Sequence, residues 1–264
     1  MDFAQIFSDY GFIPIILLAC FSFFAGFIDA VAGGGGLIQL PALLVTLPNT
    51  HIPTLLGTNK IAGLAGTSIS AYQYSKRIKF DYKLLFIISG FTFFASFAGA
   101  KTLSYISANT LKPLMLVILL IIVIYTFFKK DLGSVQTKTL PLKKQIILGS
   151  ILGTIVGFYD GFFGPGTGSF LMLGFVLLLG FEFIKASAYS KFINCIANIS
   201  ALLVFIWNGN YILEFAIIMA ICNVIGNICG SNMALKRGNK FIRGFFLIIV
   251  SMLILRFGYD IFFA

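Results

Sequence analysis

Long apolar runs follow one another through nearly the whole sequence, and they leave few folds open to the chain. Most are near 20 residues long, about what an α-helix needs to cross a hydrocarbon core of about 30 Å. Only 11% of the 264 residues are charged and 59% are hydrophobic, whereas a soluble domain is about one-quarter charged. The sequence therefore predicts an all-α polytopic membrane protein. Its apolar runs lie at about 11–32, 36–47, 56–75, 83–103, 111–128, 145–163, 168–181, 186–207, 211–233 and 241–263.

Two of these runs, 36–47 and 168–181, are too short to span a bilayer comfortably. Each directly follows a glycine-rich break, Gly33–Gly36 in one case and Gly164–Gly168 (GPGTG) in the other. We expect these two pieces to be re-entrant segments or half-helices. The chain then has about 8–10 hydrophobic segments, depending on whether the short pieces span the membrane or turn back.

The two halves of the sequence match each other at a fixed offset of 131 residues, with one single-residue insertion in the second glycine block. Such a shared offset at widely separated sites indicates internal repetition. It predicts two membrane repeats, 1–128 and 145–264, joined by a polar linker at 129–144. The matched pairs are Gly26 with Gly157, Asp29 with Asp160, Gly33 with Gly164, Lys60 with Lys191, and Gly99 with Gly230.

Most of the 19 Lys and Arg residues cluster in three loops, which we expect to be cytoplasmic under the positive-inside rule. One cluster follows the third run of the first half, but another follows the fourth run of the second half. Equivalent loops therefore face opposite sides, which predicts an inverted-topology repeat with both termini outside and the linker inside. Inverted repeats with broken helices are typical of secondary transporters. The clusters are Lys76, Arg77, Lys79 and Lys83; Lys129, Lys130, Lys138, Lys143 and Lys144; and Lys236, Arg237, Lys240 and Arg243.

The two glycine breaks are the candidate binding site for a small anionic solute. A helix that starts just after such a break points unpaired N–H groups and its positive dipole end at the gap, which favours an anion. Close helix packing through small residues is the alternative. We favour binding because the two breaks match each other and lie beside matched aspartates. The candidate residues are Gly33, Gly34, Gly35, Gly36, Gly164, Pro165, Gly166, Thr167, Gly168 and Ser169.

Asp29 and Asp160 stand inside apolar runs just before the breaks, where a charge is costly and rarely without a role. They could carry a proton or another coupling ion, or they could brace the breaks. A position at the membrane interface is a third alternative. Direct contact with the solute is disfavoured, because a carboxylate repels an anion.

Lys60 and Lys191 lie within matched apolar runs, in the sequences GTNK and AYSK. They could contact the anion together with their neighbours, or their long stems could snorkel to the headgroups. Gln39, in the short run of the first half, is a candidate for reading the solute. Asn194 and Asn198 lie one and two helical turns beyond Lys191 on the same face, where they could line the path or hold helices together. Asn223 and Asn227, four apart in the ninth run, are more readily explained as interhelical hydrogen bonds. The neighbours of the lysines in this set are Thr58, Asn59 and Ser190.

Other classes of function find little support in the sequence. The net charge of +10 comes without a basic-aromatic groove or soluble domain, so we expect no nucleic-acid partner. His51 is the only histidine and lies in a loop, so neither a metal site nor a histidine-based catalytic set can be assembled around it. We expect no metal, no cofactor and no enzymatic activity. The oligomeric state is left open.

The chain resembles the sulfite exporter family (TauE/SafE), also called the toluenesulfonate uptake permease family, over essentially its whole length. The resemblance rests on GFIDAVAGGGGLIQLP (26–41), GTNKIAG (57–63), GFYDGFFGPGTG (157–168) and AYSKFIN (188–194), with the surroundings of Gly99 and Gly230. It implies a transporter of the bacterial cytoplasmic membrane for sulfite, sulfoacetate or other organosulfonates. The second break departs from the plain glycine pattern at Pro165 and Thr167, so its hydroxyls would add donors that the first break lacks.

The leading hypothesis is therefore a secondary transporter that moves a small anion, such as sulfite or an organosulfonate, by alternating access of two inverted halves. Proton coupling through the two aspartates is part of that hypothesis. An anion channel of the same architecture is the second hypothesis. A membrane-embedded enzyme is the third, and the absence of a polar catalytic constellation argues against it.

Overall fold

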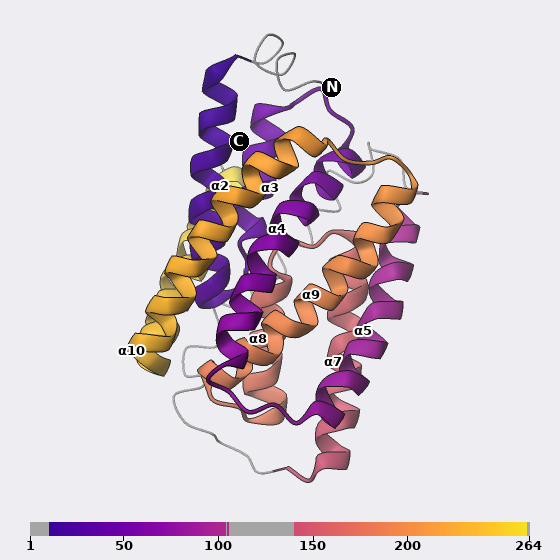
Figure 1. The fold of residues 1–264 in the computed structure, drawn as a ribbon, viewed down its shortest axis with the longest axis vertical. Coiled ribbons are helices and arrows are strands. Elements are labelled where there is room, and N and C mark those ends of the chain that lie inside the picture. Colours follow the sequence, from indigo (N-terminus) through magenta and orange to yellow (C-terminus); the bar gives the residue numbers. More distant parts are fainter. Residues whose placement is uncertain (1–10, 104, 106–139, 263–264) are drawn as a thin grey trace.

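The computed structural model describes residues 11–103, 105 and 140–262, and within these ranges it is built of helices alone (Figure 1). The fifth apolar run and most of the linker lie outside the described residues, as does 1–10. The described part of the chain confirms the all-α class. Its helices are α2 (Phe12–Ala32), α3 (Gly36–Thr46), α4 (Ile52–Ser75), α5 (Tyr82–Leu103), α7 (Leu142–Phe162), α8 (Thr167–Leu179), α9 (Phe183–Trp207) and α10 (Leu213–Phe262).

Five helical segments of the described residues are long and apolar enough to cross a membrane: α2, α5, α7, α9 and the part of α10 up to Gly238. Large apolar side chains cover the outside of the bundle, with Phe94 74% exposed and Trp207 90% exposed. In water such a surface would be unfavourable, but lipid tails cover it without cost. The protein is therefore a multi-pass membrane protein.

Helix α4 has 24 residues yet is too polar to count among these five spans. It lies in the middle of the molecule beside α9, and most of its polar side chains are buried against other helices (Figure 1). A polar group in a membrane protein is tolerated where it faces other helices rather than lipid. The polarity of α4 thus marks the interior of the bundle.

The two breaks are made by glycines in backbone conformations that other residues rarely adopt. Gly33 and Gly34 have φ of 75° and 88°, and Gly164 and Gly166 have φ of 95° and 88°. Left-handed φ interrupts the helix without the steric cost that a side chain would bring. The chain then restarts as α3, of 11 residues, and α8, of 13 residues. Their bounds agree closely with the two short runs expected from the sequence.

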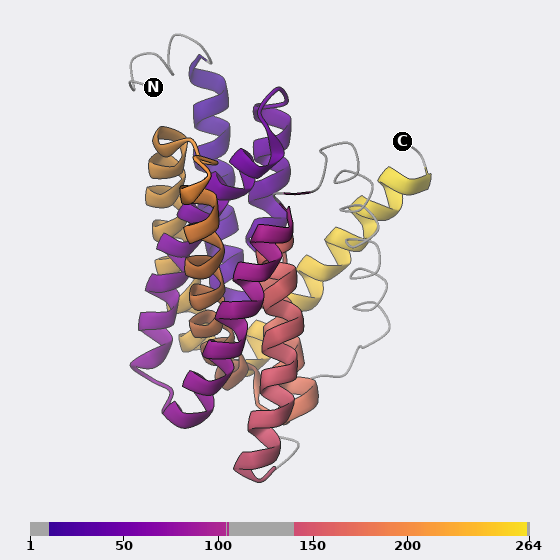
Figure 2. The ribbon, with the colours of Figure 1, turned by 90° about the vertical axis from the view of Figure 1, so that its right-hand side faces the viewer.

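Each half of the chain packs its longest interface against the other half. Helix α2 lies along α10, and α7 lies along α5, as both views show (Figures 1 and 2). Glycines make this approach close: a β-carbon on Gly99 would lie 2.1 Å from the carbonyl oxygen of Phe158, and one on Gly230 would lie 2.4 Å from that of Phe27. These two contacts are related by the 131-residue offset, so the halves use equivalent contacts.

Helix α10 changes direction at Gly238, whose φ of 76° and ψ of −167° are not helical. Figure 2 shows its last part, in yellow, running away from the rest of the bundle. The sequence predicts two apolar runs here, 211–233 and 241–263, and the bend lies between them. The site described next is formed by the part of α10 before this bend.

A polar cavity between the two helix breaks

The two breaks lie directly against each other at the centre of the bundle. A β-carbon on Gly33 would lie 2.4 Å from the carbonyl carbon of Gly168, and one on Gly36 would lie 3.2 Å from the α-carbon of Pro165. The Ser169 hydroxyl also donates a hydrogen bond of 3.0 Å to the carbonyl oxygen of Ala32. Only glycine allows such an approach of one backbone to another. The starts of α3 and α8 are therefore neighbours.

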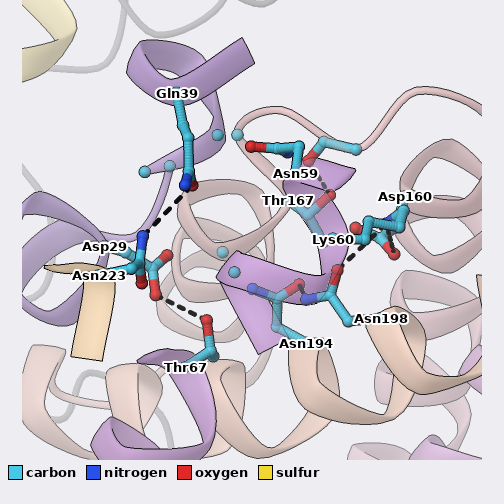
Figure 3. A pocket seen from close by; sticks show the side chains of 17 residues that line it. Asp29, Gln39, Asn59, Lys60, Thr67, Asp160, Thr167, Asn194, Asn198 and Asn223 are labelled. Atoms are coloured by element: carbon cyan, nitrogen blue, oxygen red, sulfur yellow. Dashed lines mark hydrogen bonds and ion pairs between the residues drawn. The ribbon is translucent and has the colours of Figure 1, made fainter. Parts of the chain in front are cut away.

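A cavity of about 40 Å³ lies beside this contact, a volume that could hold a few water molecules or a small solute (Figure 3). All the residues that line it are glycine or polar, in a chain that is 59% hydrophobic. The first amides of a helix have no partner within the helix, and here the first residues of α3 and α8 line the cavity. The lining residues are Asp29, Gly34, Gly35, Gly36, Gln39, Asn59, Lys60, Gly63, Thr67, Asp160, Gly164, Gly166, Thr167, Gly168, Asn194, Asn198 and Asn223.

Two buried ion pairs cross between the halves of the chain at this site. The Lys60 ammonium lies 2.8 Å from Oδ2 of Asp160, and the Lys191 ammonium lies 3.3 Å from Oδ2 of Asp29. Each lysine thus pairs with the aspartate of the other half. Lys60 is 3% exposed and Lys191 is 1% exposed. The snorkelling alternative is therefore wrong for both lysines in this structure.

The surroundings of the two ion pairs differ. The Lys191 ammonium also donates to the backbone carbonyl of Asp29, whose carboxylate accepts a 2.9 Å hydrogen bond from the Thr67 hydroxyl. The Lys60 ammonium instead donates to Oδ1 of Asn198 at 3.2 Å, and the Ser96 hydroxyl is 3.5 Å from Oδ2 of Asp160. Lys60, Asp160 and Asn198 all line the cavity, whereas Lys191 does not (Figure 3).

Some predicted site residues lie just behind the cavity wall, where they hold the helices together. The Ser190 hydroxyl donates a 2.6 Å hydrogen bond to the carbonyl oxygen of Gly168, which ties α9 to the second break. The Thr58 hydroxyl accepts a hydrogen bond of 2.9 Å from the backbone N–H of Ile212, ahead of α10. These hydrogen bonds hold the helices of the cavity wall in place, although the side chains that make them do not line the cavity. The predicted residues in this group are Gly33, Thr58, Pro165, Ser169, Ser190 and Lys191.

Four lining residues were not among the candidate site residues: Gly63, Thr67, Asn198 and Asn223. Of these, the sequence indicates Asn198, together with Asn194, as a residue that could line the path, and it predicts hydrogen bonds between helices for Asn223. The internal repeat indicates two of them, Gly63 and Thr67. The offset of 131 relates Gly63 to Asn194 and Thr67 to Asn198, so both follow from the asparagines that lie beyond Lys191 on its helical face. Asn223 had no such signal, because its counterpart Thr92 does not line the cavity.

One polar atom of the cavity wall has no hydrogen-bond partner in the described part of the chain. This atom is Oδ1 of Asn59, a residue that is 9% exposed. A buried acceptor without a partner is unfavourable, and a water molecule or a solute that carries a donor could satisfy it. Among the described residues, no cluster of three or more His, Cys, Asp or Glu side chains could hold a metal ion. The donors of this cavity fit a small polar solute.

Comparison with known proteins places this architecture in a family. The family model described as sulfite exporter TauE/SafE matches residues 18–257, nearly the whole chain. The chain belongs to the TauE/SafE family. This membership confirms the resemblance seen in the sequence motifs, and it covers both breaks and both ion pairs.

Relatives within the TauE/SafE family match along nearly their full length. A "Probable membrane transporter protein ORF9" from Sinorhizobium sp is 35% identical over 94% of this chain and 94% of its own length. The "Probable membrane transporter protein YfcA" of Escherichia coli (strain K12) is 36% identical over 94% and 91%. A "Probable membrane transporter protein" of Haemophilus influenzae is 32% identical over 96% and 97%. No solved structure matches this one.

Proposed function

We propose that the protein is a secondary transporter that moves small anions, sulfite or organosulfonates among them, by alternating access of two inverted repeats. As a member of the TauE/SafE family it is a membrane transporter. The observation that carries the finer proposal is a cavity lined only by glycine and polar residues, buried between two helix breaks in an otherwise apolar bundle.

The cavity offers several groups to an anion. The first turns of α3 and α8 bring backbone N–H groups and positive dipole ends to it, as at other anion sites on helix N-termini. The Lys60 ammonium and the side-chain amides of Asn194 and Asn198 add further donors. The hydroxyls of Thr167 and Ser169 add none, because they donate to the backbone carbonyls of Gly164 and Ala32. A sulfur oxyanion suits these donors because its oxygens accept several hydrogen bonds at once, and the family name supports this class of solute.

Alternating access follows from the correspondence between the halves. The breaks, the ion pairs and the glycine contacts of α5 and α10 are all related by the same offset, which supports an inverted repeat of 1–128 and 145–264 around a linker at 129–144. In such transporters one half rocks against the other around a central site. We propose that α3 and α8 are half-helices, and that the protein lies in the bacterial cytoplasmic membrane with both termini outside.

Transport assays on proteoliposomes test this proposal. The panel comprises sulfite, sulfate, methanesulfonate, isethionate, sulfoacetate and, as contrasting anions, acetate and succinate. We expect saturable flux of at least one sulfur oxyanion, and counterflow of labelled solute against an unlabelled load on the other side. Flux that never saturates and follows voltage alone would indicate a channel instead. A reporter fused to the C-terminus that proves cytoplasmic would contradict the inverted topology.

A further inference from the structure

We infer that the anion takes the place of the Asp160 carboxylate on the Lys60 ammonium, and that Asp160 takes up one proton as it leaves. Asp29 braces the site instead and keeps its partner throughout. The inference rests on the proposed anion-binding function, and it assigns different roles to two aspartates that the repeat makes equivalent.

The charges at the site cancel before any solute arrives. Lys60 is paired with Asp160 and Lys191 with Asp29, so neither ammonium has a free positive charge to offer. The helix N-termini supply only partial charge, about half a unit each. An anion that binds without further change would add a full negative charge to a buried site. Such a charge is costly unless it is paired.

This cost is avoided if the anion replaces the Asp160 carboxylate as the partner of the Lys60 ammonium. If the anion occupies the ammonium, the Asp160 carboxylate, which is 1% exposed, loses the one cationic partner that it has among the described residues. A buried carboxylate without a partner takes up a proton rather than remain charged. The proton comes from water and adds to a carboxylate oxygen, one ion pair breaks and another forms, and no electrons move. For a monovalent anion, the total charge of the site is then the same with and without solute, and a divalent anion adds one negative charge instead of two.

The geometry selects Asp160 rather than Asp29 for this exchange. Lys60 and its two partners, Asp160 and Asn198, all line the cavity, so an anion there reaches the ammonium directly (Figure 3). Lys191 does not line the cavity, and it is held by both the backbone carbonyl and the carboxylate of Asp29. An anion in the cavity therefore does not reach the Lys191 ammonium as it reaches that of Lys60.

The groups around Asp160 leave no other candidate for the proton. Helix α4 contributes Lys60, α5 contributes the Ser96 hydroxyl, and α9 contributes Asn198, which shares the Lys60 ammonium. The neighbouring Tyr159 directs its hydroxyl to the carbonyl oxygen of Pro165 at 2.5 Å. Among the residues that line the cavity, the only other carboxyl group belongs to Asp29, which keeps Lys191.

The test measures protons taken up as an anion binds to the purified full-length protein. The probes are methanesulfonate, isethionate, sulfoacetate and sulfate, which stay fully ionised near pH 7 and so release no proton of their own. Calorimetry in buffers of different ionisation enthalpy gives the proton count. We expect about one proton per anion for the wild type, and an affinity that falls about tenfold for each unit rise in pH.

Two variants assign the proton. Asp160→Asn should bind the anion with no proton uptake and with an affinity independent of pH. The double variant D29N/K191Q removes the matched pair without leaving an unpaired charge, and it should keep the count at about one. Uptake of a proton by Asp160→Asn would overturn the assignment. Should that variant not fold, the wild-type proton count alone still decides whether exchange occurs.

The outcomes separate this inference from the proposed function. If none of the four probes binds to the wild type and none of the panel is transported, the proposed function fails. If a probe binds and no proton is taken up, the proposed function stands and the exchange at Lys60 is wrong.

Discussion

In the first half of the chain, the turn after the helix break brings Gln39 into the cavity, whereas the corresponding turn of the second half carries Leu171, which is fully buried in the apolar core. The same contrast recurs on other helices. Asn223 lines the cavity and its counterpart Thr92 does not, and Asn59 lines it while its counterpart Ser190 lies behind the wall. Three of the five amide side chains in the wall therefore come from positions whose counterparts lie outside it, while the other two, Asn194 and Asn198, stand opposite Gly63 and Thr67.

What the halves share is the frame around these side chains. Both have a glycine break, an aspartate before it, and a lysine that pairs with the aspartate of the other half. The contrast teaches that backbone and ion pairs set the shape of the site symmetrically, while the side chains that line it differ between matched positions. Variants at matched positions can test this division. Substitutions at matched glycines or ion-pair residues should change stability equally in the two halves, whereas substitutions at matched positions of the cavity wall should change solute binding unequally.

The polarity also extends beyond the cavity, and it takes different forms at the two matched interfaces. The Asn223 amide donates to Gln39 at 3.3 Å, Asn227 donates to Asn223 at 2.8 Å, and the Ser70 hydroxyl donates to Asn227 at 2.6 Å. These residues join α4 and α10 by a continuous chain of side-chain hydrogen bonds. Between α5 and α9, the hydroxyls of Ser96 and Ser200 instead donate to backbone carbonyls, and Ala201, the counterpart of Ser70, is fully buried among apolar side chains.

The largest effect should come from breaking a cross-half ion pair. Lys191→Met leaves the Asp29 carboxylate buried without its cation, which should lower the free energy of unfolding by about 3–5 kcal/mol. Lys191→Met combined with Asp29→Asn removes the stranded charge, so the double variant should regain most of this loss. Unfolding in mixed micelles measures both. A double variant no more stable than the single one would show that the pair does not brace the frame.

The glycine contacts should respond equally in the two halves. Gly99→Ala and Gly230→Ala each place a methyl group within 2.4 Å of a backbone oxygen on the opposing helix, so the helices must separate. We expect each to lower the free energy of unfolding by about 1–3 kcal/mol. Gly90→Ala, on the same helix as Gly99 but with open space around it, is the control and should be neutral or stabilising. Clearly unequal losses at Gly99 and Gly230 would break the symmetry of the frame.

The sequence predicts the helix breaks, the aspartates and the lysines well, because each is marked by a local motif that occurs in both halves. Left-handed glycines interrupt a helix wherever they occur, and a fixed offset shows that Asp29 and Lys60 have counterparts at Asp160 and Lys191. The offset cannot show which lysine meets which aspartate. Both the pairing within a half and the pairing across halves satisfy it. Only the tertiary structure, in which α4 packs against α9, selects the pairing across halves.

The wall of the cavity is predicted less well, for a reason of helical geometry. Neighbours of Lys60 and Lys191 in the sequence, such as Thr58 and Ser190, point in other directions around the helix and lie behind the wall. Residues three and seven positions after a lysine share its face, and for Lys60 these are Gly63 and Thr67, which do line the cavity. Asn223 lies far along the chain on α10, and only the fold brings it there.

Solute affinity should respond unequally at the matched wall positions. Asn223→Ala removes an amide that lines the cavity and bonds to Gln39, and we expect the dissociation constant of the transported anion to rise about 3- to 10-fold, the range that one hydrogen bond supplies. Thr92→Ala, at the matched position outside the cavity, should leave it unchanged. Equilibrium binding to the purified protein measures both. Equal effects at the two positions would mean that recognition is shared by both halves.

The smallest expected effect is on stability, and it comes from a substitution at the same residue, Thr92. Oγ1 of Thr92 is buried and has no hydrogen-bond partner in the described part of the chain. Thr92→Val keeps the shape of the side chain and removes the unpaired hydroxyl, so it should raise the free energy of unfolding by up to about 1 kcal/mol. Thr58→Val is the matched control, because its hydroxyl donates to the Thr54 carbonyl and accepts from the Ile212 amide. That variant should lose stability, since it leaves a backbone N–H without a partner. If Thr92→Val also destabilised the protein, the hydroxyl would have a hydrogen-bond partner at the α5–α7 interface, and polar contacts would stabilise this interface as well.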